Sequence, residues 1–306
     1  MRFVAVLNRE GGTLRTMNIE ALSEGLNQIL VQAGHTVDVR VVNSANIVEE
    51  LERAARMRSA DVVLAGGGDG TISAAAAALM GKDIALAVLP AGTMNLFARS
   101  LDIPQQLDAA LTAFASGKIK RVDIASADGR PFVHQFSIGF HAKMVVLRDK
   151  MEFKSRLGKM GASVKAAYRT VLNPPSVRVR LNIGETEIVT RASGIGITNN
   201  LFGEGHLPYA DKPDGGTLGI YITVAKERAQ LVRFAMNMAR GKWRDNDQVE
   251  IHEAEEADLT LLSAHKRLGC VIDGEICPLK RITRFKIHKK ALKVLVPRAA
   301  ANAKAA

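Results

Sequence analysis

The sequence predicts an α/β protein. Its N-terminal domain should be a three-layer structure on a mainly parallel sheet, followed by a β-rich, antiparallel, sandwich-like C-terminal domain. Strands and helices alternate over residues 1–125, two of these strands run into glycine-rich loops, and short strand-like segments dominate residues 126–284. A chain of 306 residues is also long for one hydrophobic core, so two domains are expected.

The first domain is predicted from alternating strands and helices. In order along the chain we expect strands at 2–7, 35–42, 62–65 and 84–89, and helices at 19–33 and 47–58. Apolar residues recur at helical spacing in both helices, and Gly34 closes the first of them. This alternation is typical of a parallel sheet covered on both faces, which binds its ligands at the carboxyl ends of the strands.

The second domain reads as a series of short strands. The expected strands are 132–138, 177–183, 187–198, 217–223, 248–252, 259–262 and 269–272, with helices at 156–172 and 226–240 and final strands at 282–288 and 291–296. Pro174 and Pro175 stop the first of these helices. The alanine-rich tail, 299–306, is expected to be disordered.

The composition is that of a globular protein with a basic surface. Apolar residues make up 47% and charged residues 24%, and the formal net charge is +11. Aromatic residues are only 5%, which argues against a stacking platform for single-stranded nucleic acid, and we expect no nucleic-acid partner. The basic excess suits an anionic membrane surface, although an ordinary solvated surface explains it equally well.

The cysteines and the N-terminal segment predict a cytoplasmic protein. Cys270 and Cys277 are the only cysteines and do not form a C-x-x-C pair, which favours reduced thiols. Residues 1–7 read as a first strand, too short for a signal peptide, and no apolar stretch reaches transmembrane length. Any association with a membrane is therefore expected to be peripheral.

The most informative stretch of the chain is residues 60–74. An apolar strand runs into Gly66-Gly67-Gly68, then Asp69-Gly70-Thr71, and then an alanine-rich helix. Glycines let the backbone approach a ligand closely, and the N–H groups of the following helical turn favour anions, so this loop is predicted to hold a phosphate. It is not a P-loop, since no Gly-Lys-Ser/Thr follows. A tight turn without a ligand is the competing interpretation.

A second loop of this kind follows the next strand. It reads Pro90-Ala-Gly-Thr-Met-Asn95, and together with Gly66–Thr71 it resembles the diacylglycerol kinase catalytic family, which includes sphingosine, ceramide and bacterial lipid kinases. The first motif is shared with NAD kinases and related phosphofructokinases, whereas the second is much more specific. The resemblance continues through Ser137-Ile-Gly-Phe140, Thr198-Asn-Asn200 and Val271-Ile-Asp-Gly-Glu275.

This resemblance implies the fold of the first domain, the cofactors and the substrate class. The first domain should be NAD-kinase/phosphofructokinase-like, spanning 1–125 and rejoined by about 285–298, with a lipid-substrate domain at 126–284. ATP and Mg²⁺ are the implied cofactors, and a lipid at an anionic membrane surface is the implied partner. The implied ATP contacts are Asn8, Gly66, Gly67, Gly68, Asp69, Gly70, Thr71, Gly92, Thr93 and Asn95.

Three of these residues also have a purely structural interpretation. Thr71 could be the N-cap of its helix, and Asn95 could cap the helix that begins at Leu96. A carboxylate in a glycine loop is usually a turn residue. The resemblance instead implies that Asp69 lies near the acceptor hydroxyl or the metal.

The segment Asp273-Gly274-Glu275 also has two interpretations. Asp-Gly between apolar residues is a strong signal for a β-hairpin. The resemblance implies a catalytic role, in which Glu275 accepts the proton of the attacking hydroxyl and Asp273 is its partner on Mg²⁺ or on the hydroxyl. The histidines His141 and His206 lie near matched motifs but are assigned no role.

Three features depart from the family pattern. The loop Asn8-Arg-Glu-Gly-Gly12 keeps the asparagine and glycine but lacks the usual proline. The threonine expected near the ribose falls at about 42–43, where there is none. The family's metal-associated Asp-Gly-x-Leu aligns on Leu218 with Gly215 at the aspartate position, so Asp214 could bind the metal only if the loop shifts by one residue.

The sequence therefore predicts an ATP-dependent lipid kinase that transfers the γ-phosphate of ATP to a diacylglycerol-like hydroxyl. One alternative is a NAD-kinase-like enzyme acting on a small molecule, and another is a non-catalytic regulator that binds nucleotide or lipid. The identity of the lipid and the oligomeric state, a homodimer included, are left open.

Overall fold

A computed structural model describes residues 1–306 except 150–174, 206, 225–227, 240–246, 263–268 and 299–306. The helix predicted at 156–172 and the tail at 299–306 therefore lie outside the described residues. The chain forms two compact units, one made of Met1–Val122 with Lys290–Ala306 and the other of Asp123–Lys289. The sequence placed this division near residue 125.

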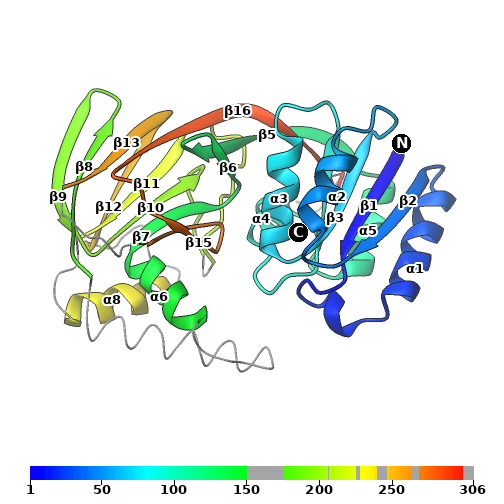
Figure 1. Ribbon diagram of the computed structural model, residues 1–306, viewed down its shortest axis with the longest axis horizontal. Helices are drawn as coiled ribbons and strands as arrows, with labels where there is room; N and C mark the ends of the chain where they lie inside the picture. The colour runs from blue at the N-terminus through cyan, green and yellow to red at the C-terminus, as the bar shows by residue number, and fades with distance from the viewer. Residues whose placement is uncertain (150–174, 206, 225–227, 240–246, 263–268, 299–306) are drawn as a thin grey trace, which may run out of the picture. The chain divides into compact units, whose positions relative to one another are not determined.

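The sheet of the first unit is parallel, as predicted. Its strands lie in the order β2-β1-β3-β4, with the last part of β16 next to β4 (Figure 1). The strands are β1 (Arg2–Asn8), β2 (Thr36–Val42), β3 (Val62–Gly67), β4 (Ala85–Pro90) and β16 (Ile282–Val296). Both β3 and β4 are buried along their whole length, as expected for central strands covered on both faces.

The helices of the first unit bury one apolar stripe each. They are α1 (Ile19–Gln32), α2 (Ile47–Ala54), α3 (Asp69–Leu79), α4 (Leu96–Ser100) and α5 (Leu107–Ala115). In α1 the buried residues Ile19, Leu22, Leu26 and Leu30 recur every three or four positions, and the Asn18 side chain caps the first turn. The sequence analysis gave no bounds for α5, the helix that packs against α1.

The second unit is built on antiparallel strands, also as predicted. One sheet has the order β12-β11-β10-β7-β14-β15. The first part of β16 continues the other sheet in the order β16-β13-β8-β9, with each of these strands antiparallel to the next. The bounds are β5 (Lys118–Ala127), β6 (Arg130–Phe132), β7 (Gln135–Gly139), β8 (Val177–Ile183), β9 (Thr186–Ala192), β10 (Gly194–Asn199), β11 (Leu218–Thr223), β12 (Val249–Ala254), β13 (Glu256–Leu261), β14 (Gly269–Ile272) and β15 (Glu275–Pro278). The helices are α6 (Phe140–Asp149) and α8 (Arg228–Ala239).

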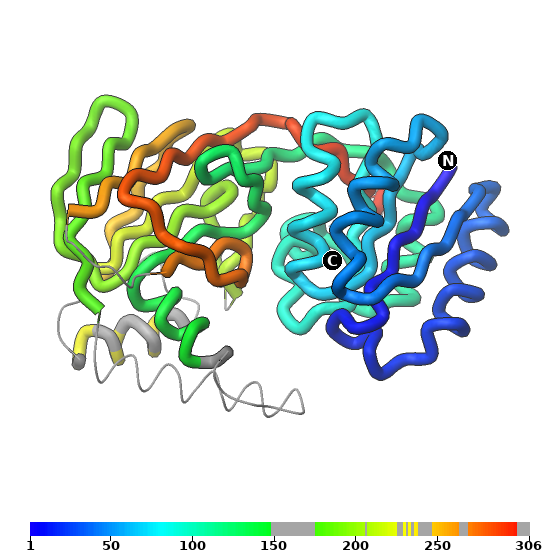
Figure 2. Tube along the Cα trace, in the orientation of Figure 1, coloured from blue at the N-terminus to red at the C-terminus, as the bar shows by residue number. Residues whose placement is uncertain are grey.

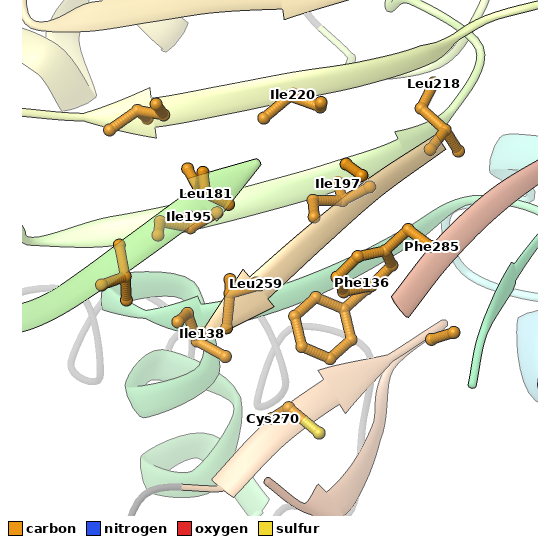
Figure 3. Packing of buried hydrophobic residues seen from close by; sticks show 14 of the residues in the cluster. Phe136, Ile138, Leu181, Ile195, Ile197, Leu218, Ile220, Leu259, Cys270 and Phe285 are labelled. Atoms are coloured by element: carbon orange, nitrogen blue, oxygen red, sulfur yellow. The ribbon is translucent and has the colours of Figure 1, made fainter. Parts of the chain in front are cut away.

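Alternate residues of these strands form the core of the second unit. Figure 3 shows side chains from several strands meeting there, and the rings of Phe136 and Phe285 pack edge to face at 4.8 Å. The residues that alternate with them on β7 and β10 therefore lie on the other face of their sheet. Where one strand was predicted over 187–198, the chain leaves β9 at Ala192 and starts β10 at Gly194.

Two strands run from one unit into the other. Both β5 and β16 cross the division of the chain, and Figure 2 lets the reader follow them as continuous stretches of backbone. The last residues of β16 are buried in the first unit, with Val294 opposite Leu86 of β4. The second unit is thus an insertion between two parts of the first.

Candidate functional site

The loops that follow β1, β2 and β3 meet at the carboxyl edge of the parallel sheet. Asn8, at the end of β1, contacts the other two loops. This buried side chain donates from Nδ2 to the Thr71 hydroxyl at 3.2 Å, and its Oδ1 accepts from the Glu10 backbone and the Ser44 hydroxyl, both at 3.1 Å. Thr71 belongs to the loop after β3, and Ser44 follows β2. Asn8 therefore holds the loops around the edge in place. Ser44 is the residue here that the sequence analysis missed, because no motif marks it.

The start of α3 is suited to an anion. Its N-cap residue is Gly68, so no side chain occupies the cap position. A Cβ built on Gly68 would meet no atom within 4 Å, which leaves space beside the first turn. Thr71 is not the N-cap, so that alternative is wrong; it lies inside the first turn, where its hydroxyl accepts from Asn8.

Asp69 links the loops after β3 and β4. Its Oδ1 accepts a hydrogen bond from the Leu96 backbone N–H at 3.2 Å, so this carboxylate occupies the N-terminus of α4. A local role of this kind leaves open its predicted role at the hydroxyl or the metal. The carboxylate is held where the two glycine-rich loops meet.

Asn95 shapes the second loop from inside. It has a left-handed backbone, with φ at +51°, and its side chain accepts from the Gly92 N–H at 2.7 Å and donates to the Pro90 carbonyl at 3.1 Å. Asn95 stands at the N-cap position of α4 but makes no side-chain cap hydrogen bond, so the capping alternative is wrong. Thr93 in the same loop is exposed and available to a ligand.

The glycines of these loops sit where the backbones pass close to one another. Gly12 has φ at +55°, and a Cβ there would lie 1.9 Å from the Ala91 carbonyl oxygen. A Cβ on Gly92 would lie 2.7 Å from Asn95 Oδ1, and one on Gly67 would lie 2.5 Å from the Thr71 hydroxyl. The sequence therefore needs glycine here for packing as well as for any ligand.

In the second unit, Asp273-Gly274 forms the predicted hairpin turn. Strands β14 and β15 pair with Ile272 opposite Glu275, and Asp273 and Gly274 have φ values of +46° and +88°. The Asp273 carboxylate accepts three backbone hydrogen bonds from residues 133–135, at 2.9, 3.0 and 3.0 Å. This carboxylate therefore fastens the turn to the segment before β7, a structural role beside the predicted catalytic one.

Glu275 carries the carboxylate that the turn presents to solvent. Its side chain is 61% exposed and pairs with the Arg130 guanidinium at 2.5 Å. Arg130 also donates to the Cys277 sulfur at 2.9 Å. Both oxygens of a carboxylate can accept protons or hydrogen bonds, so an arginine-paired Glu275 retains an oxygen for an acceptor hydroxyl.

The loop that contains Asp214 is organised around a different carboxylate. Asp214 is exposed, whereas Asp123 is buried, and Asp123 Oδ2 accepts from Asn200 Nδ2 at 2.8 Å and from the Gly216 N–H at 2.7 Å. No group of three or more His, Cys, Asp or Glu is placed to hold a metal ion in the part of the chain that the structure describes. The metal role of Asp214 stays a prediction, and Asp123 is a residue that the motif alignment did not find.

The second unit also contains an apolar pocket of about 210 Å³. It lies against β7, β10 and β11 and is walled by residues of α6, among them Phe140, His141 and Met144. A pocket with few polar groups suits a hydrocarbon ligand.

Comparisons with known proteins match both units. Residues 2–127 match the model of the diacylglycerol kinase catalytic domain, and residues 135–296 match that of the YegS C-terminal NAD kinase beta sandwich-like domain. The chain therefore belongs to the family of proteins that join a diacylglycerol kinase catalytic domain to a YegS C-terminal domain. The resemblance inferred from the two glycine-rich loops is confirmed.

Curated proteins are similar in sequence. A protein of Synechocystis named "Uncharacterized protein sll0036" is 28% identical over 86% of this chain and 62% of its own length. "Probable lipid kinase YegS" of Escherichia coli is 33% identical over 50% of this chain and 52% of its own. The chain thus spans between about half and three-fifths of the length of these curated relatives.

Solved structures agree in fold. A diacylglycerol kinase structure from Bacillus anthracis matches with a TM-score of 0.74 at 18% identity, covering 98% of each chain. A further structure from the same organism gives a TM-score of 0.78 at 19% identity, covering 98% of this chain and 96% of the other. The predicted fold class, a parallel α/β unit followed by an antiparallel β unit, is confirmed. Among the described residues, no helix is long and apolar enough to cross a membrane.

Proposed function

We propose that the protein is an ATP-dependent lipid kinase that transfers the γ-phosphate of ATP to a hydroxyl of a diacylglycerol-like lipid. The observation that carries the proposal is the hydrogen-bonded set of loops at the carboxyl edge of the parallel sheet. Asn8 and Asp69 tie the loops after β1, β3 and β4 together beside the uncapped start of α3, and Asn95 shapes the last of these loops from inside. This is the edge at which α/β sheets bind ligands, and backbone N–H groups there suit phosphates.

The residues at this edge fit a nucleotide with its metal. The start of α3 offers N–H groups to phosphate oxygens, and Thr93 offers an exposed hydroxyl. Mg²⁺ is commonly held by one or two carboxylates together with substrate phosphates, so Asp69 alone would serve, although the described residues contain no larger acidic cluster placed for a metal. When bound, Mg²⁺ would neutralise charge on the transferring phosphate.

In the proposed reaction, Glu275 takes the proton of the lipid hydroxyl as the hydroxyl oxygen attacks the γ-phosphorus. The exposure of the carboxylate supports this assignment, because the side chain presents an acceptor oxygen to solvent while it pairs with Arg130. Asp273 supports Glu275 by fixing the turn on which the base stands.

We also propose that the enzyme meets its substrate at an anionic membrane surface. The net charge of +11 and the exposed Val232 and Met236, one turn apart on α8, support this. Sedimentation with phosphatidylglycerol vesicles, but not with phosphatidylcholine vesicles, is expected. Equal recovery with both would contradict an electrostatic contribution.

The test is a kinase assay with γ-labelled ATP, Mg²⁺ and a total lipid extract in micelles. A labelled lipid should form with the wild type and be lost with Glu275→Gln, which keeps the size of the side chain and its place on the turn. Asp102→Asn, a change of the same kind at an exposed aspartate in a left-handed backbone, should leave the product unchanged. A soluble phosphorylated product would indicate a small-molecule kinase, and ATP binding without turnover would indicate a regulator.

A further inference from the structure

Cys270 and Cys277 stand opposite one another in the hairpin that carries Glu275. Strands β14 and β15 pair antiparallel with Cys270 directly opposite Cys277, so the two side chains lie on the same face of the hairpin. Both pack against the core of the second unit, and Figure 3 shows Cys270 on β14 beside that core. Both are free thiols, one buried and the other partly exposed. The hairpin therefore holds a pair of thiols, one of which solvent reaches.

The spacing of the two cysteines suits a disulfide. Residues directly opposite in an antiparallel pair have Cβ atoms about 4.5–5.5 Å apart, and a disulfide requires about 3.5–4.5 Å. The Cys270 sulfur lies 3.5 Å from the Cys277 carbonyl oxygen, so its side chain already reaches across to β15. Among the described strands, β15 is the last of its sheet and pairs only with β14. A shift of this strand by about 1 Å therefore allows the bond to form.

The surroundings of the two sulfurs differ. Cys277 Sγ accepts a hydrogen bond from the Arg130 guanidinium at 2.9 Å. A positive charge beside a cysteine that solvent reaches is typical of reactive thiols, because it attracts the thiolate that attacks an oxidant. Burial raises the pKa of Cys270 to about 11, with a smaller contribution from Cys277, so the Cys270 thiol is inert toward an oxidant in solution. Cys277 is thus placed to react first and Cys270 to react with the product.

Glu275 shares its arginine partner with Cys277. It lies two residues earlier on β15, on the same face, and its carboxylate pairs with the Arg130 guanidinium at 2.5 Å. Turning the Cys277 sulfur toward Cys270 removes one acceptor from Arg130, and drawing β15 toward β14 moves the strand that holds Glu275. A misplacement of about 1 Å in a reacting geometry can slow a reaction about 10²-fold.

We propose that Cys277 and Cys270 form a site of reversible oxidation by hydroperoxides, and that the resulting cross-strand disulfide lowers turnover by displacing Glu275. The Cys277 thiolate attacks one oxygen of hydrogen peroxide; the S–O bond forms, the O–O bond breaks, and the other oxygen leaves as hydroxide, which the released thiol proton converts to water. The Cys270 sulfur then attacks the sulfenic acid sulfur, and the S–O bond breaks to release a second water that carries the Cys270 proton. The two sulfurs lose two electrons, which reduce the peroxide. The effect on turnover rests on the proposed kinase function, whereas the oxidation does not.

Peroxide treatment of the whole protein tests the chemistry separately from the kinase reaction. Hydrogen peroxide should remove both free thiols and leave a tryptic peptide that spans both cysteines and is lighter by two hydrogen atoms. Cys277→Ser should form no disulfide and keep the Cys270 thiol, and Cys270→Ala should stop at the sulfenic acid, which dimedone traps. Arg130 is a positioning residue for this reaction. Arg130→Gln should slow the oxidation of Cys277 roughly tenfold, the value of one hydrogen bond to a charged group, and Arg130→Lys, which keeps the charge, should restore most of the rate.

The kinase assay then tests the effect on turnover. Turnover should fall about 10²-fold as the disulfide forms and return with dithiothreitol, which reduces a disulfide but not a methionine sulfoxide. Cys277→Ser should match the untreated wild type and keep its turnover in peroxide. Thiols that stay free, a disulfide between two molecules, or a disulfide that leaves turnover unchanged would overturn the proposal. A protein that forms the disulfide as expected but phosphorylates no lipid before treatment would refute the kinase function and leave the oxidation site standing.

Discussion

The buried carboxylate of Asp273 should contribute more to the stability of the second unit than any other group of the proposed catalytic turn. Asp273→Ala leaves three backbone N–H donors without their acceptor, one at a buried position and two at partly buried positions. Taking about 2 kcal/mol for the first and about 1 kcal/mol for each of the others gives a loss of about 4 kcal/mol. For a domain of this size the loss corresponds to a Tm lower by about 8–16 °C.

Calorimetry of the unfolding transition of the second unit measures this effect. Asp273→Asn should lose about half as much, because asparagine tolerates the positive φ and keeps one acceptor oxygen. Asp102→Asn, at an exposed position with φ at +54°, is the matched control and should leave the Tm unchanged. If Asp273→Ala unfolds at the wild-type temperature but has lost turnover, the carboxylate acts on the substrate and the structural account is refuted.

Two other predictions concern the loops proposed to bind nucleotide and the pH dependence of stability. Gly12→Ala should weaken ATP binding at least tenfold by calorimetric titration, because its Cβ would lie 1.9 Å from the Ala91 carbonyl oxygen, whereas Gly25→Ala, with no atom within 4 Å, should bind normally. The pKa of His134 is lowered to about 3 by burial and by nearby His141. The imidazole therefore binds a proton near pH 6.5 in the unfolded chain but stays neutral in the folded chain until the pH approaches 3. The free energy of unfolding should therefore fall as the pH drops from 7 toward 3, and less steeply in His134→Phe; parallel pH profiles would contradict this.

Local sequence predicted the turn at Asp273 but not what it fastens. Asp-Gly between apolar residues was enough to predict a hairpin, since few residues adopt two successive positive φ values. The partners of the carboxylate lie about 140 residues earlier in the chain. Hydrogen bonds over such separations depend on how the strands pair, and a single sequence carries no local signal for them.

The second glycine loop shows how a neighbour can overrule a local preference. Asparagine before a helix is a common cap, and Asn95 stands at that position. Asp69, from the loop after the adjacent strand, reaches the helix N-terminus instead, and Asn95 turns back to Gly92. The sequence analysis found both residues through their motifs and missed the exchange of roles between them.

The loop at Asp214 also departs from what its motif predicted, because a residue distant in the sequence organises it. Aligning the motif on Leu218 placed Gly215 at the aspartate position and left the site without an acid. The folded loop brings the N–H of Gly216, with φ at +81°, to the buried Asp123. Asp123 lies outside every motif, so its part in the loop is visible only once the strands are paired.

The insertion of the second unit between two parts of the first sets an order of events during synthesis. The segment of β16 that pairs with β4 emerges roughly 170 residues after the rest of its unit, which at about 5–20 residues per second is a delay of about 9–35 s. During that time the ribosome holds a nearly complete first unit in which the edge of β4 is unpaired. A nascent chain therefore depends on the timely folding of the inserted unit, or on a chaperone, to keep that edge from pairing with another chain.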